Sequence, residues 1–335
     1  MTQQGLRYLS LFSGVEAATL AWKPLGWKAV AFAEFDAFPS AVLAHHYPDV
    51  PNLGDVTKIE GSRYRGTVDL IVGGSPCQGF SVAGERLGLD DPRSALALAY
   101  VRLLGEVRPR WFVWENVPGV ISTNRGSDFK SFVKAITELG YCCSWRVLDA
   151  QYVRCSGFEE AIPQRRKRIF VVGYLGDWRA SAKVLFESDS LPRDFGSIQE
   201  VRTSTFGTYG KRFEKTDSQR EPVKIYDSPH TFGRVTDNDV CPTLIARAGT
   251  GGGNVPLVIT HGQVRQLTPL ECERFMGFPD DYTKVPFNGK PADECSDSHR
   301  YKACGNSMCV NVMRWVGQRI QEVDTSIDKS QESFT

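Results

Sequence analysis

The tetrapeptide Ser75-Pro76-Cys77-Gln78 places a thiol where a nucleophile could act. It follows an apolar run at residues 69–73, which predicts a buried strand, and open α/β sheets bind ligands at the carboxyl ends of their strands. Pro76 fixes its own φ and restricts Ser75, so this turn is expected to be stiff. A thiolate is a good nucleophile, whereas most cysteines are small buried hydrophobic residues. The tetrapeptide alone leaves both interpretations open.

A carboxylate has an equivalent place after another apolar run, in Trp114-Glu115-Asn116-Val117-Pro118. Burial beside a pocket raises the pKa of a carboxyl group and suits it to donate a proton. A strand-end glutamate that faces solvent is more common, so this motif is also ambiguous by itself.

A basic cluster, Gln164-Arg165-Arg166-Lys167-Arg168, leads into a predicted strand at residues 169–173. Side chains alternate along an extended chain. This alternation predicts Gln164, Arg166 and Arg168 on one side of the segment and Arg165 and Lys167 on the other. One side would then face a site while the other is solvated; the alternative is a charge run that is solvated throughout.

The first turn between a strand and a helix reads Phe12-Ser13-Gly14-Val15-Glu16 and lacks the pattern G-x-G-x-x-G. That pattern cradles a pyrophosphate, so its absence argues against a nicotinamide-dependent oxidoreductase. Glu34 ends the next predicted strand, where an acid can accept hydrogen bonds from ribose hydroxyls. Asp55 follows the next helix and could accept a hydrogen bond from an adenine amino group.

Short apolar runs alternate with amphipathic stretches through the first 175 residues. This alternation predicts a mostly parallel sheet with helices on both faces. The expected strands are residues 8–12, 29–33, 69–73, 111–114 and 169–173; the expected helices are one that ends at residue 22 and those at 38–47, 94–106 and 128–139.

The pattern changes near Gly176. Residues 177–262 are rich in Gly, Ser, Thr and Asp, which predicts a small domain of short strands and loops. Helical structure returns at Thr268-Pro269-Leu270-Glu271, a capping box with Pro at the first helical position, and Gly277 is placed to end that helix. A last helix is expected at residues 307–321, followed by a frayed polar tail at 322–335.

Charge and cysteine content limit the classes of function. Lys and Arg total 40 and Asp and Glu total 39 among 335 residues, a formal net charge of +1. This balance excludes binding of polyanions by bulk positive charge, although not by a local basic groove. The nine cysteines are odd in number and form no C-x-x-C pair, so we expect no disulfide framework, no metal site and a reducing compartment. No apolar run reaches the roughly 20 residues that span a bilayer, so we expect a cytoplasmic protein without membrane contact.

In their order and spacing, these motifs resemble those of the DNA cytosine-C5 methyltransferase family in its bacterial and phage forms. The series begins with Phe-x-Gly at 12–14, Glu34, Asp55, Pro-Cys-Gln at 76–78 and Glu-Asn-Val at 115–117. It continues with Gln-x-Arg-x-Arg at 164–168, a variable region, Arg265-Gln266-Leu267-Thr268-Pro269 with Glu271, and Gly305-Asn306-Ser307. The matches extend over residues 8–321, nearly the whole chain.

The resemblance implies an α/β enzyme with the Rossmann-like fold of the S-adenosyl-L-methionine-dependent methyltransferases. Its substrate would be a cytosine flipped out of a short sequence in double-stranded DNA, and its second product S-adenosyl-L-homocysteine. Cys77 would attack C6 of the base, Glu115 would protonate or hydrogen-bond N3, and Arg166 would contact O2. Gln164 and Arg168, from the same motif as Arg166, complete the implied catalytic set.

The resemblance also implies two sets of binding residues. Those around the cofactor are Phe12, Ser13, Gly14, Glu34, Phe35, Asp55, Val56, Pro76, Leu98, Asn306 and Met308. Those for DNA are Gln78, Ser81 and Arg93, from the loop after Cys77, and Thr243 and Leu244, which would support the backbone of the flipped nucleotide.

Three positions depart from the family pattern. Many members have a second glycine in the first turn where this chain has Glu16, and an acid where this chain has Ser10. Met308 stands where a β-branched residue is frequent, and we expect little consequence. The exchange at residues 10 and 16 bears on how this turn contacts the cofactor.

The implied organisation is a catalytic and cofactor-binding domain at residues 1–176, completed by 303–321. A target-recognition domain follows at 177–264, then a return segment and hinge at 265–302 and the tail at 322–335. We expect this second domain to be smaller, irregular and rich in β-structure. The compact layout is typical of bacterial and phage members, so we expect a monomer in the cytoplasm of a bacterium or a phage-infected cell.

Two alternatives are a tRNA cytosine-C5 methyltransferase and a catalytically silent paralogue that binds DNA. About 86 residues between the two blocks of motifs favour a DNA-reading domain over the first. The joint presence of Cys77, Glu115 and Arg166 argues against the second, because a silent copy is free to lose them. The expected partner is double-stranded DNA. If the enzyme belongs to a restriction-modification pair, a restriction endonuclease would act separately on the same sequence.

Overall fold

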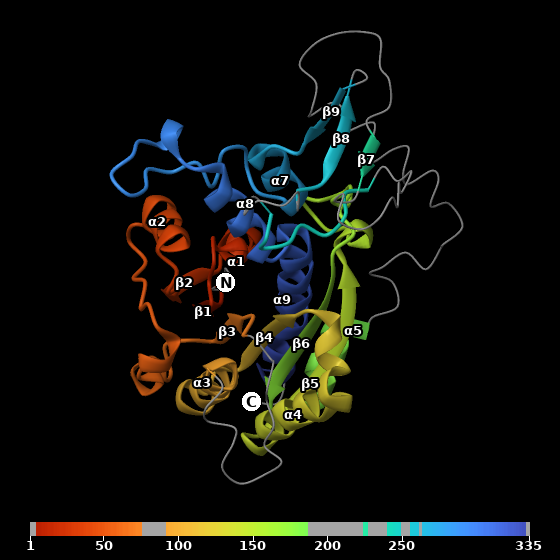
Figure 1. Cartoon of the computed structure of the whole chain (residues 1–335). Coiled ribbons are helices and arrows are strands. Elements are labelled where there is room, and N and C mark those ends of the chain that lie inside the picture. The colour runs from red at the N-terminus through yellow and green to blue at the C-terminus, as the bar shows by residue number, and fades with distance from the viewer. Residues whose placement is uncertain are drawn as a thin grey trace, which may run out of the picture. The chain divides into compact units, whose positions relative to one another are not determined.

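The computed structural model describes residues 5–75, 92–186, 224–226, 240–248, 255–260 and 263–332. The side chains of residues 92–95, 224, 226, 259, 260, 263 and 330–332 lie outside that description. The chain divides into two compact units. Unit 1 consists of Met1–Leu148, Lys167–Glu187 and Met313–Thr335; unit 2 consists of Asp149–Arg166 and Ser188–Val312. The second unit thus interrupts the first twice along the sequence (Figure 1).

Unit 1 is built on a six-stranded sheet in the order β2-β1-β3-β4-β6-β5. β1 pairs in parallel with β2 and β3, and β3 with β4, whereas β4 and β6 run antiparallel. The predicted α/β class and the mostly parallel sheet are therefore confirmed. The strands are β1 (Arg7–Leu11), β2 (Lys28–Ala33), β3 (Leu70–Gly73), β4 (Trp111–Asn116), β5 (Tyr141–Asp149) and β6 (Lys167–Leu175).

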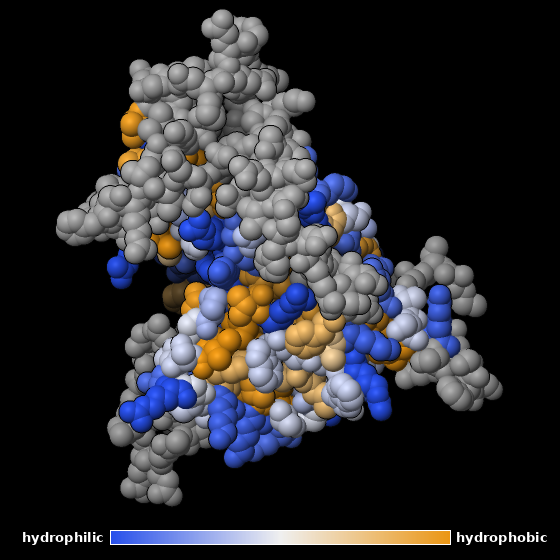
Figure 2. Space-filling view, turned by 90° about the vertical axis from the view of Figure 1, so that its right-hand side faces the viewer, coloured by the Kyte–Doolittle hydropathy of each residue, from blue (hydrophilic) through white to orange (hydrophobic). Residues whose placement is uncertain are grey.

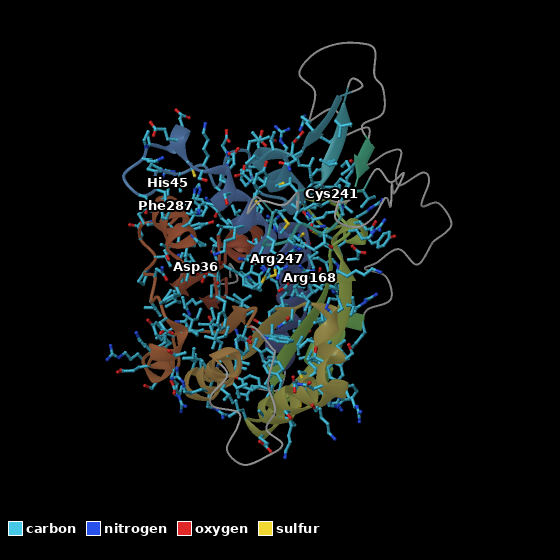
Figure 3. The ribbon with its side chains drawn as sticks, viewed as in Figure 1. Asp36, His45, Arg168, Cys241, Arg247 and Phe287 are labelled. Carbon is cyan, nitrogen blue, oxygen red and sulfur yellow. The ribbon has the colours of Figure 1, made fainter. Side chains whose placement is uncertain are left out.

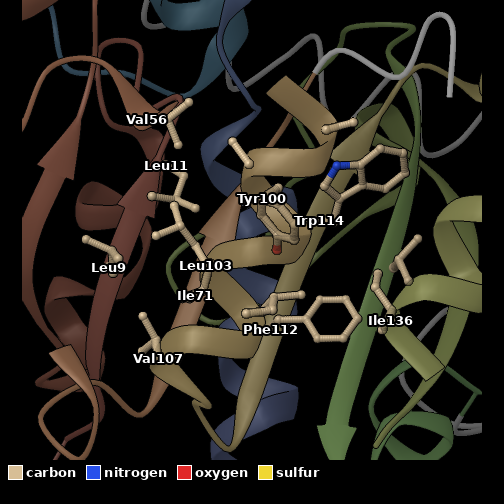
Figure 4. Packing of buried hydrophobic residues seen from close by; sticks show 14 of the residues in the cluster. Leu9, Leu11, Val56, Ile71, Tyr100, Leu103, Val107, Phe112, Trp114 and Ile136 are labelled. Carbon is tan, nitrogen blue, oxygen red and sulfur yellow. The ribbon is translucent and has the colours of Figure 1, made fainter. Parts of the chain in front are cut away.

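Helices cover both faces of this sheet. Alternate residues of the strands, such as Leu9 and Phe112, form one buried cluster with residues of α3 (Pro92–Val107) and α4 (Ser127–Glu138) (Figure 4). α1 (Ala17–Trp22) and α9 (Val310–Glu332) lie on the other face, where Trp22 packs against Tyr8 and Asp324 accepts from Trp111. There the indole of Trp22 donates to the carbonyl of Met313 at 2.8 Å. Both faces are hydrophobic because a parallel sheet is buried on both sides.

The last helix is longer than expected. α9 runs through Glu332, whereas the sequence predicts an end at residue 321 and a frayed tail. The end of this helix is polar in composition but contains a buried acid. Asp324 is 3% exposed and accepts a hydrogen bond from the indole of Trp111 at 2.7 Å. Asp324 also pairs with Arg110 at 3.1 Å. These contacts hold a polar segment against the sheet.

Two further elements were not expected from the sequence. β5 is the edge strand after β6, and α5 (Trp178–Phe186) packs on β6 within unit 1, inside the segment predicted to be irregular from residue 177. Trp145 and Val147 of β5 are each 42% exposed. Figure 2 views this side of the molecule and shows apolar side chains among polar ones.

Unit 2 contains a three-stranded antiparallel sheet in the order β7-β8-β9. The capping box predicted at Thr268 and Glu271 is present, and Gly277 ends that helix with a φ of 83°. The elements are β7 (Lys224–Tyr226), β8 (Leu257–Thr260), β9 (Gln263–Gln266), α7 (Pro269–Met276) and α8 (Asp297–Asn306).

The remaining helices are short or irregular. Within the described ranges they are α2 (Ala37–His46), in unit 1, and the 3₁₀ helices Lys23–Leu25, Val56–Lys58, Gly61–Tyr64, Pro118–Ile121, Thr123–Gly126, Ala150–Tyr152 and Ala292–Glu294. In the part of the chain that the structure describes, no helix is long and apolar enough to cross a membrane.

Candidate active site

The turn after β1 is held to the end of β2 by its own serine. Ser13 Oγ donates to the carbonyl of Ser10 at 2.9 Å and accepts from the amide of Ala33 at 3.1 Å. The amide of Ser13 also donates to the carbonyl of Ala33, at 3.2 Å. Phe12 and Gly14 both have positive φ values, 53° and 55°. The backbone therefore doubles back tightly between the strand and α1.

Glu34 at the end of β2 braces this turn from the other side. One carboxylate oxygen accepts from the amide of Gly14 at 2.7 Å and the other from the amide of Asp36 at 2.7 Å. Burial raises the pKa of Glu34, although these amides oppose the shift. Each oxygen keeps a lone pair, so the carboxylate can still accept hydrogen bonds from ribose hydroxyls.

Two observations support a cofactor at this turn. A Cβ added to Gly14 would meet nothing within 4 Å, so there is open space in front of the turn. Phe35, next to Glu34, is 78% exposed, which is high for a ring of its size. The open backbone at Gly14, the Glu34 carboxylate and the exposed Phe35 ring are groups that fit a nucleoside. The carboxylate suits the ribose hydroxyls and the ring suits the base.

Asp55 is fixed by local hydrogen bonds. Its Oδ1 accepts from the amide of Thr57 at 2.9 Å and from the Thr57 hydroxyl at 2.7 Å, and these bonds lower the pKa of Asp55. Its neighbour Val56 is 4% exposed and belongs to the core, so only its backbone is available for a ligand. Leu98 of α3 is 37% exposed.

The strand end that precedes Cys77 is anchored to β4. The hydroxyl of Ser75 accepts from the indole of Trp114 at 2.9 Å, and the carbonyl of Ser75 accepts from the side-chain amide of Asn116 at 2.7 Å. Ser75 itself is fully buried. The anchoring roles of Trp114 and Asn116 were not expected. β3 and β4 are neighbours in the sheet, but the sequence alone does not reveal that they pair. Pro76, Cys77, Gln78 and Ser81 lie outside the described residues, as does the side chain of Arg93.

Glu115 forms an ion pair with Arg168, whose Nε lies 3.2 Å from Glu115 Oε1. The sheet register explains the pair. Glu115 on β4 lies directly opposite Phe170 on β6, and Arg168 stands two residues before Phe170 on the same face. The two side chains are 12% and 15% exposed. Figure 3 labels Arg168 on β6.

The alternation predicted for residues 164–168 is confirmed. Gln164 and Arg166 are buried and Arg168 is mostly buried, whereas Arg165 and Lys167 are exposed.

Arg166 belongs to unit 2, where its guanidinium donates to backbone carbonyls. They are those of Leu244 at 2.8 Å, Gly305 at 3.1 Å and Ser307 at 2.6 Å. Its amide donates to the carboxylate of Asp149 at 3.0 Å. The Arg166 guanidinium is thus held by three backbone carbonyls, and Arg168 is the arginine beside Glu115.

The Thr243-Leu244 element is tied to the same stretch of unit 2. The hydroxyl of Thr243 donates to the carbonyl of Arg165 at 2.5 Å, and Gln164 forms a parallel bridge with Cys241. The side-chain amide of Gln164 donates to the carbonyl of Phe275 at 3.0 Å. Gln164 therefore acts inside unit 2 as a packing and hydrogen-bonding residue.

At the end of α8 in unit 2, Asn306 is exposed and Met308 is half-buried. A Cβ on Gly305 would overlap the backbone of Ile245 and Ala246. This close approach accounts for glycine at residue 305. Among the described residues no group of three or more His, Cys, Asp or Glu side chains could hold a metal ion.

A mostly parallel sheet with a tight first turn and acids at its strand ends is typical of the α/β enzymes that bind nucleoside cofactors. The solved structures agree on the fold. The crystal structure of the S. pombe Dnmt2 methyltransferase matches 95% of this chain and 99% of its own, with a TM-score of 0.65 and 18% sequence identity.

The sequence model of the family described as C-5 cytosine-specific DNA methylase matches residues 6–322. The chain therefore belongs to this family, and it is an enzyme of the DNA cytosine-C5 methyltransferase class. The Type II methyltransferase M.Bsp6I of Bacillus sp. (strain RFL6) is 30% identical over 94% of this chain and 98% of its own length.

A relative from Escherichia phage P1, named DNA N-6-adenine-methyltransferase, is 29% identical over 94% of this chain. The present chain spans 61% of the length of that phage protein.

Proposed function

We propose that this chain methylates C5 of a cytosine flipped out of a short sequence in double-stranded DNA, through a covalent bond between Cys77 and C6. The observation that carries the proposal is the Glu115–Arg168 ion pair at the end of β4. It lies next to Asn116, which bonds Ser75. Because Cys77 follows Ser75 by two residues, the anchoring of Ser75 supports a place for the thiol at this end of the sheet.

The chemistry needs a nucleophile and a group that withdraws electrons from the ring. The Cys77 thiolate forms a bond to C6, and the electron pair of the C5–C6 double bond moves into the ring, making C5 nucleophilic. Glu115 protonates or hydrogen-bonds N3, which limits the negative charge on the ring. We assign the O2 contact to Arg168 rather than Arg166, since Arg168 is the one beside Glu115.

After the methyl group is added, the C5 proton leaves and its electron pair re-forms the C5–C6 double bond, which expels the Cys77 thiolate. No side-chain base for this proton is evident among the described residues, and water is our candidate.

The turn 12–14, Glu34, Phe35 and Asp55 are the residues that would hold S-adenosyl-L-methionine. This cofactor, when bound, supplies the methyl group and leaves as S-adenosyl-L-homocysteine. Glu34 would accept from the ribose, Phe35 would pack on the base, and Asp55 would accept from its amino group. The Ser13 contacts with Ser10 and Ala33 hold the turn in place for this purpose.

Unit 2 would read the DNA. Its Thr243-Leu244 element, fixed by Arg165 and Arg166, would support the backbone of the flipped nucleotide. We propose a monomer, with a restriction endonuclease as a separate protein if the enzyme belongs to a modification pair.

A duplex with 5-fluorocytosine at the target position tests the covalent step. With S-adenosyl-L-methionine present, C5 of the fluorinated base takes up the methyl group. Fluorine cannot then leave C5 as a proton does, so the Cys77–C6 bond should persist. We expect a protein–DNA adduct that survives denaturing electrophoresis with wild type and is absent with Cys77→Ala. An adduct in the Cys77→Ala protein would contradict the proposed nucleophile. An adduct formed with 5-fluorocytosine tRNA and not with DNA would contradict the proposed substrate.

A further inference from the structure

Glu16 lies behind the cofactor turn with its carboxylate buried, and the side chain is 1% exposed. Its backbone is left-handed, with φ 66° and ψ 64°. This conformation costs a residue with a Cβ about 1–2 kcal/mol relative to the ordinary helical region. A glycine would avoid that cost, so the side chain must contribute something that a glycine cannot.

The Glu16 carboxylate joins β1 to the first turn of α1. One oxygen accepts from the amide and the hydroxyl of Thr19, both at 3.0 Å, and the other accepts from the hydroxyl of Ser10 at 2.7 Å. The amide of Glu16 donates to the carbonyl of Ser13 at 2.9 Å. The turn 12–15 is thus closed at both of its ends by one residue.

The charges around Glu16 do not neutralise it. The titratable groups that act on it are Tyr8 of β1 and Glu34 at the end of β2. Thr19 of α1 and Ser10 contribute only uncharged donors, and no basic side chain in the described ranges forms an ion pair with it. Burial raises the pKa of Glu16 to about 7, and the bonds from Ser10 and Thr19 oppose that shift.

The hydrogen bond between Ser10 and Glu16 joins the two positions at which this turn departs from the family pattern. The family pattern to which the sequence motifs are similar has an acid in many members where this chain has Ser10, and a glycine where it has Glu16. The longer Glu16 side chain reaches the Ser10 hydroxyl, so a carboxylate again lies beside residue 10.

We propose that Glu16 is a positioning residue for S-adenosyl-L-methionine, whose ionised carboxylate holds the turn 12–15 in its binding form, so that cofactor affinity depends on the ionisation of Glu16. This inference rests on the cofactor proposed above. The ionised carboxylate accepts hydrogen bonds from the Ser10 hydroxyl, the Thr19 amide and the Thr19 hydroxyl at once. A protonated carboxyl group instead turns an O–H donor toward these groups. Negative charge behind the turn also favours a ligand that carries a sulfonium and an ammonium group.

The experiment is calorimetric titration of the full chain with S-adenosyl-L-methionine at pH 6, 7 and 8. If only the ionised form binds well, wild-type affinity should rise about tenfold from pH 6 to pH 8. Glu16→Gln, which resembles the protonated acid, should bind weakly at pH 8. Because glutamine does not ionise, the pH dependence measured with Glu16→Gln is that of the ligand's own amino group.

Two further variants separate this role from a merely structural one. Glu16→Gly should bind weakly, and the double variant Ser10→Asp/Glu16→Gly should recover affinity, because the carboxylate returns on the strand. Asp324→Asn is the matched control. Asp324 is also a buried acid with a pKa raised by burial, but it contacts Trp111 at the start of β4, away from the turn. It should bind as wild type does.

The outcomes are distinct. Equal affinities and equal pH profiles for wild type and Glu16→Gln would overturn the inference, as would a double variant no better than Glu16→Gly. The wild-type pH profile requires no variant to fold, so a flat profile would also overturn it. Failure of wild type to bind S-adenosyl-L-methionine at any pH would instead contradict the proposed function.

Discussion

The pairing of Glu115 with Arg168 connects two motifs that lie 53 positions apart in the sequence. Both side chains are largely buried, and removing one partner of such a pair leaves the other charge without compensation. In the proposed mechanism, Arg168 also keeps Glu115 in place beside the base. Its loss should therefore affect the chemical step more than the binding of DNA.

We expect Arg168→Gln to lower kcat by roughly a hundredfold or more, by analogy with the loss of one electrostatic stabiliser in other active sites. Lys167→Ala is the matched control, because Lys167 is the adjacent basic residue on the exposed side of the strand. Single-turnover methylation of a radiolabelled duplex would measure both. A variant Arg168→Gln with wild-type turnover would remove Arg168 from the site.

Glu16 allows a second test, of stability rather than binding. Its pKa is about 7 in the folded protein, well above that of an unfolded glutamate, so the folded state binds more protons between about pH 4.5 and pH 7. The contribution of Glu16 to stability therefore falls as pH rises through this range. The whole shift corresponds to roughly 3 kcal/mol.

We expect the unfolding free energy of Glu16→Gln to rise relative to wild type as pH increases from 5 to 8, since glutamine has no charge to bury. Urea denaturation at both pH values would measure the difference. The same variant is expected to lose cofactor affinity, so stability and binding should move in opposite directions. A difference that stays constant with pH would contradict the burial of an ionisable Glu16.

At the scale of the elements, close packing between β4 and β6 depends on a glycine at residue 173. Gly173 lies directly opposite Phe112 in the register, and a Cβ there would overlap the Phe112 ring. The ring belongs to the core between the sheet and the helices α3 and α4. β6 carries Arg168 as well, so this contact also positions the site.

We expect Gly173→Ala to destabilise the protein by about 1–3 kcal/mol, the usual cost of overpacking a core. Gly119→Ala is the control, because a Cβ at Gly119 meets nothing within 4 Å. Thermal unfolding of the two variants beside wild type would measure the effects. A melting temperature of Gly173→Ala equal to that of Gly119→Ala would show that the ring yields at little cost.

Prediction from the sequence works where one periodic pattern decides an element. Leu9 and Phe112 lie in short apolar strands, and the helices between them have apolar faces, so the sheet and its helices are predictable. The alternation of buried and exposed residues at 164–168 is predictable for the same reason. The length of α9 is not, because Asp324 is buried only through contacts with Trp111 and Arg110, far away in the sequence.

The site shows the same limit. Glu115 and Arg168 can each be found by motif, but only the register of β4 against β6 shows that they pair. The three carbonyls around the Arg166 guanidinium come from residues 244, 305 and 307, which no local pattern joins to residue 166. The Glu16–Ser10 bond likewise needs the fold of the turn.

At the scale of the whole molecule, the net charge of +1 means that recognition of DNA must come from local groups rather than a general attraction. The proposed division of labour follows the two units. Unit 1 holds the candidate cofactor turn and the Glu115–Arg168 pair, and unit 2 holds the segments proposed to read and support the DNA.

The most direct test of the central claim is bisulfite sequencing of the genome of a host without cytosine methylation that expresses either wild type or Cys77→Ala. We expect protected cytosines within one short sequence for wild type and complete conversion for Cys77→Ala, with both proteins present in soluble form. Complete conversion with soluble wild-type protein would contradict the claim that this chain methylates C5 of cytosine in DNA.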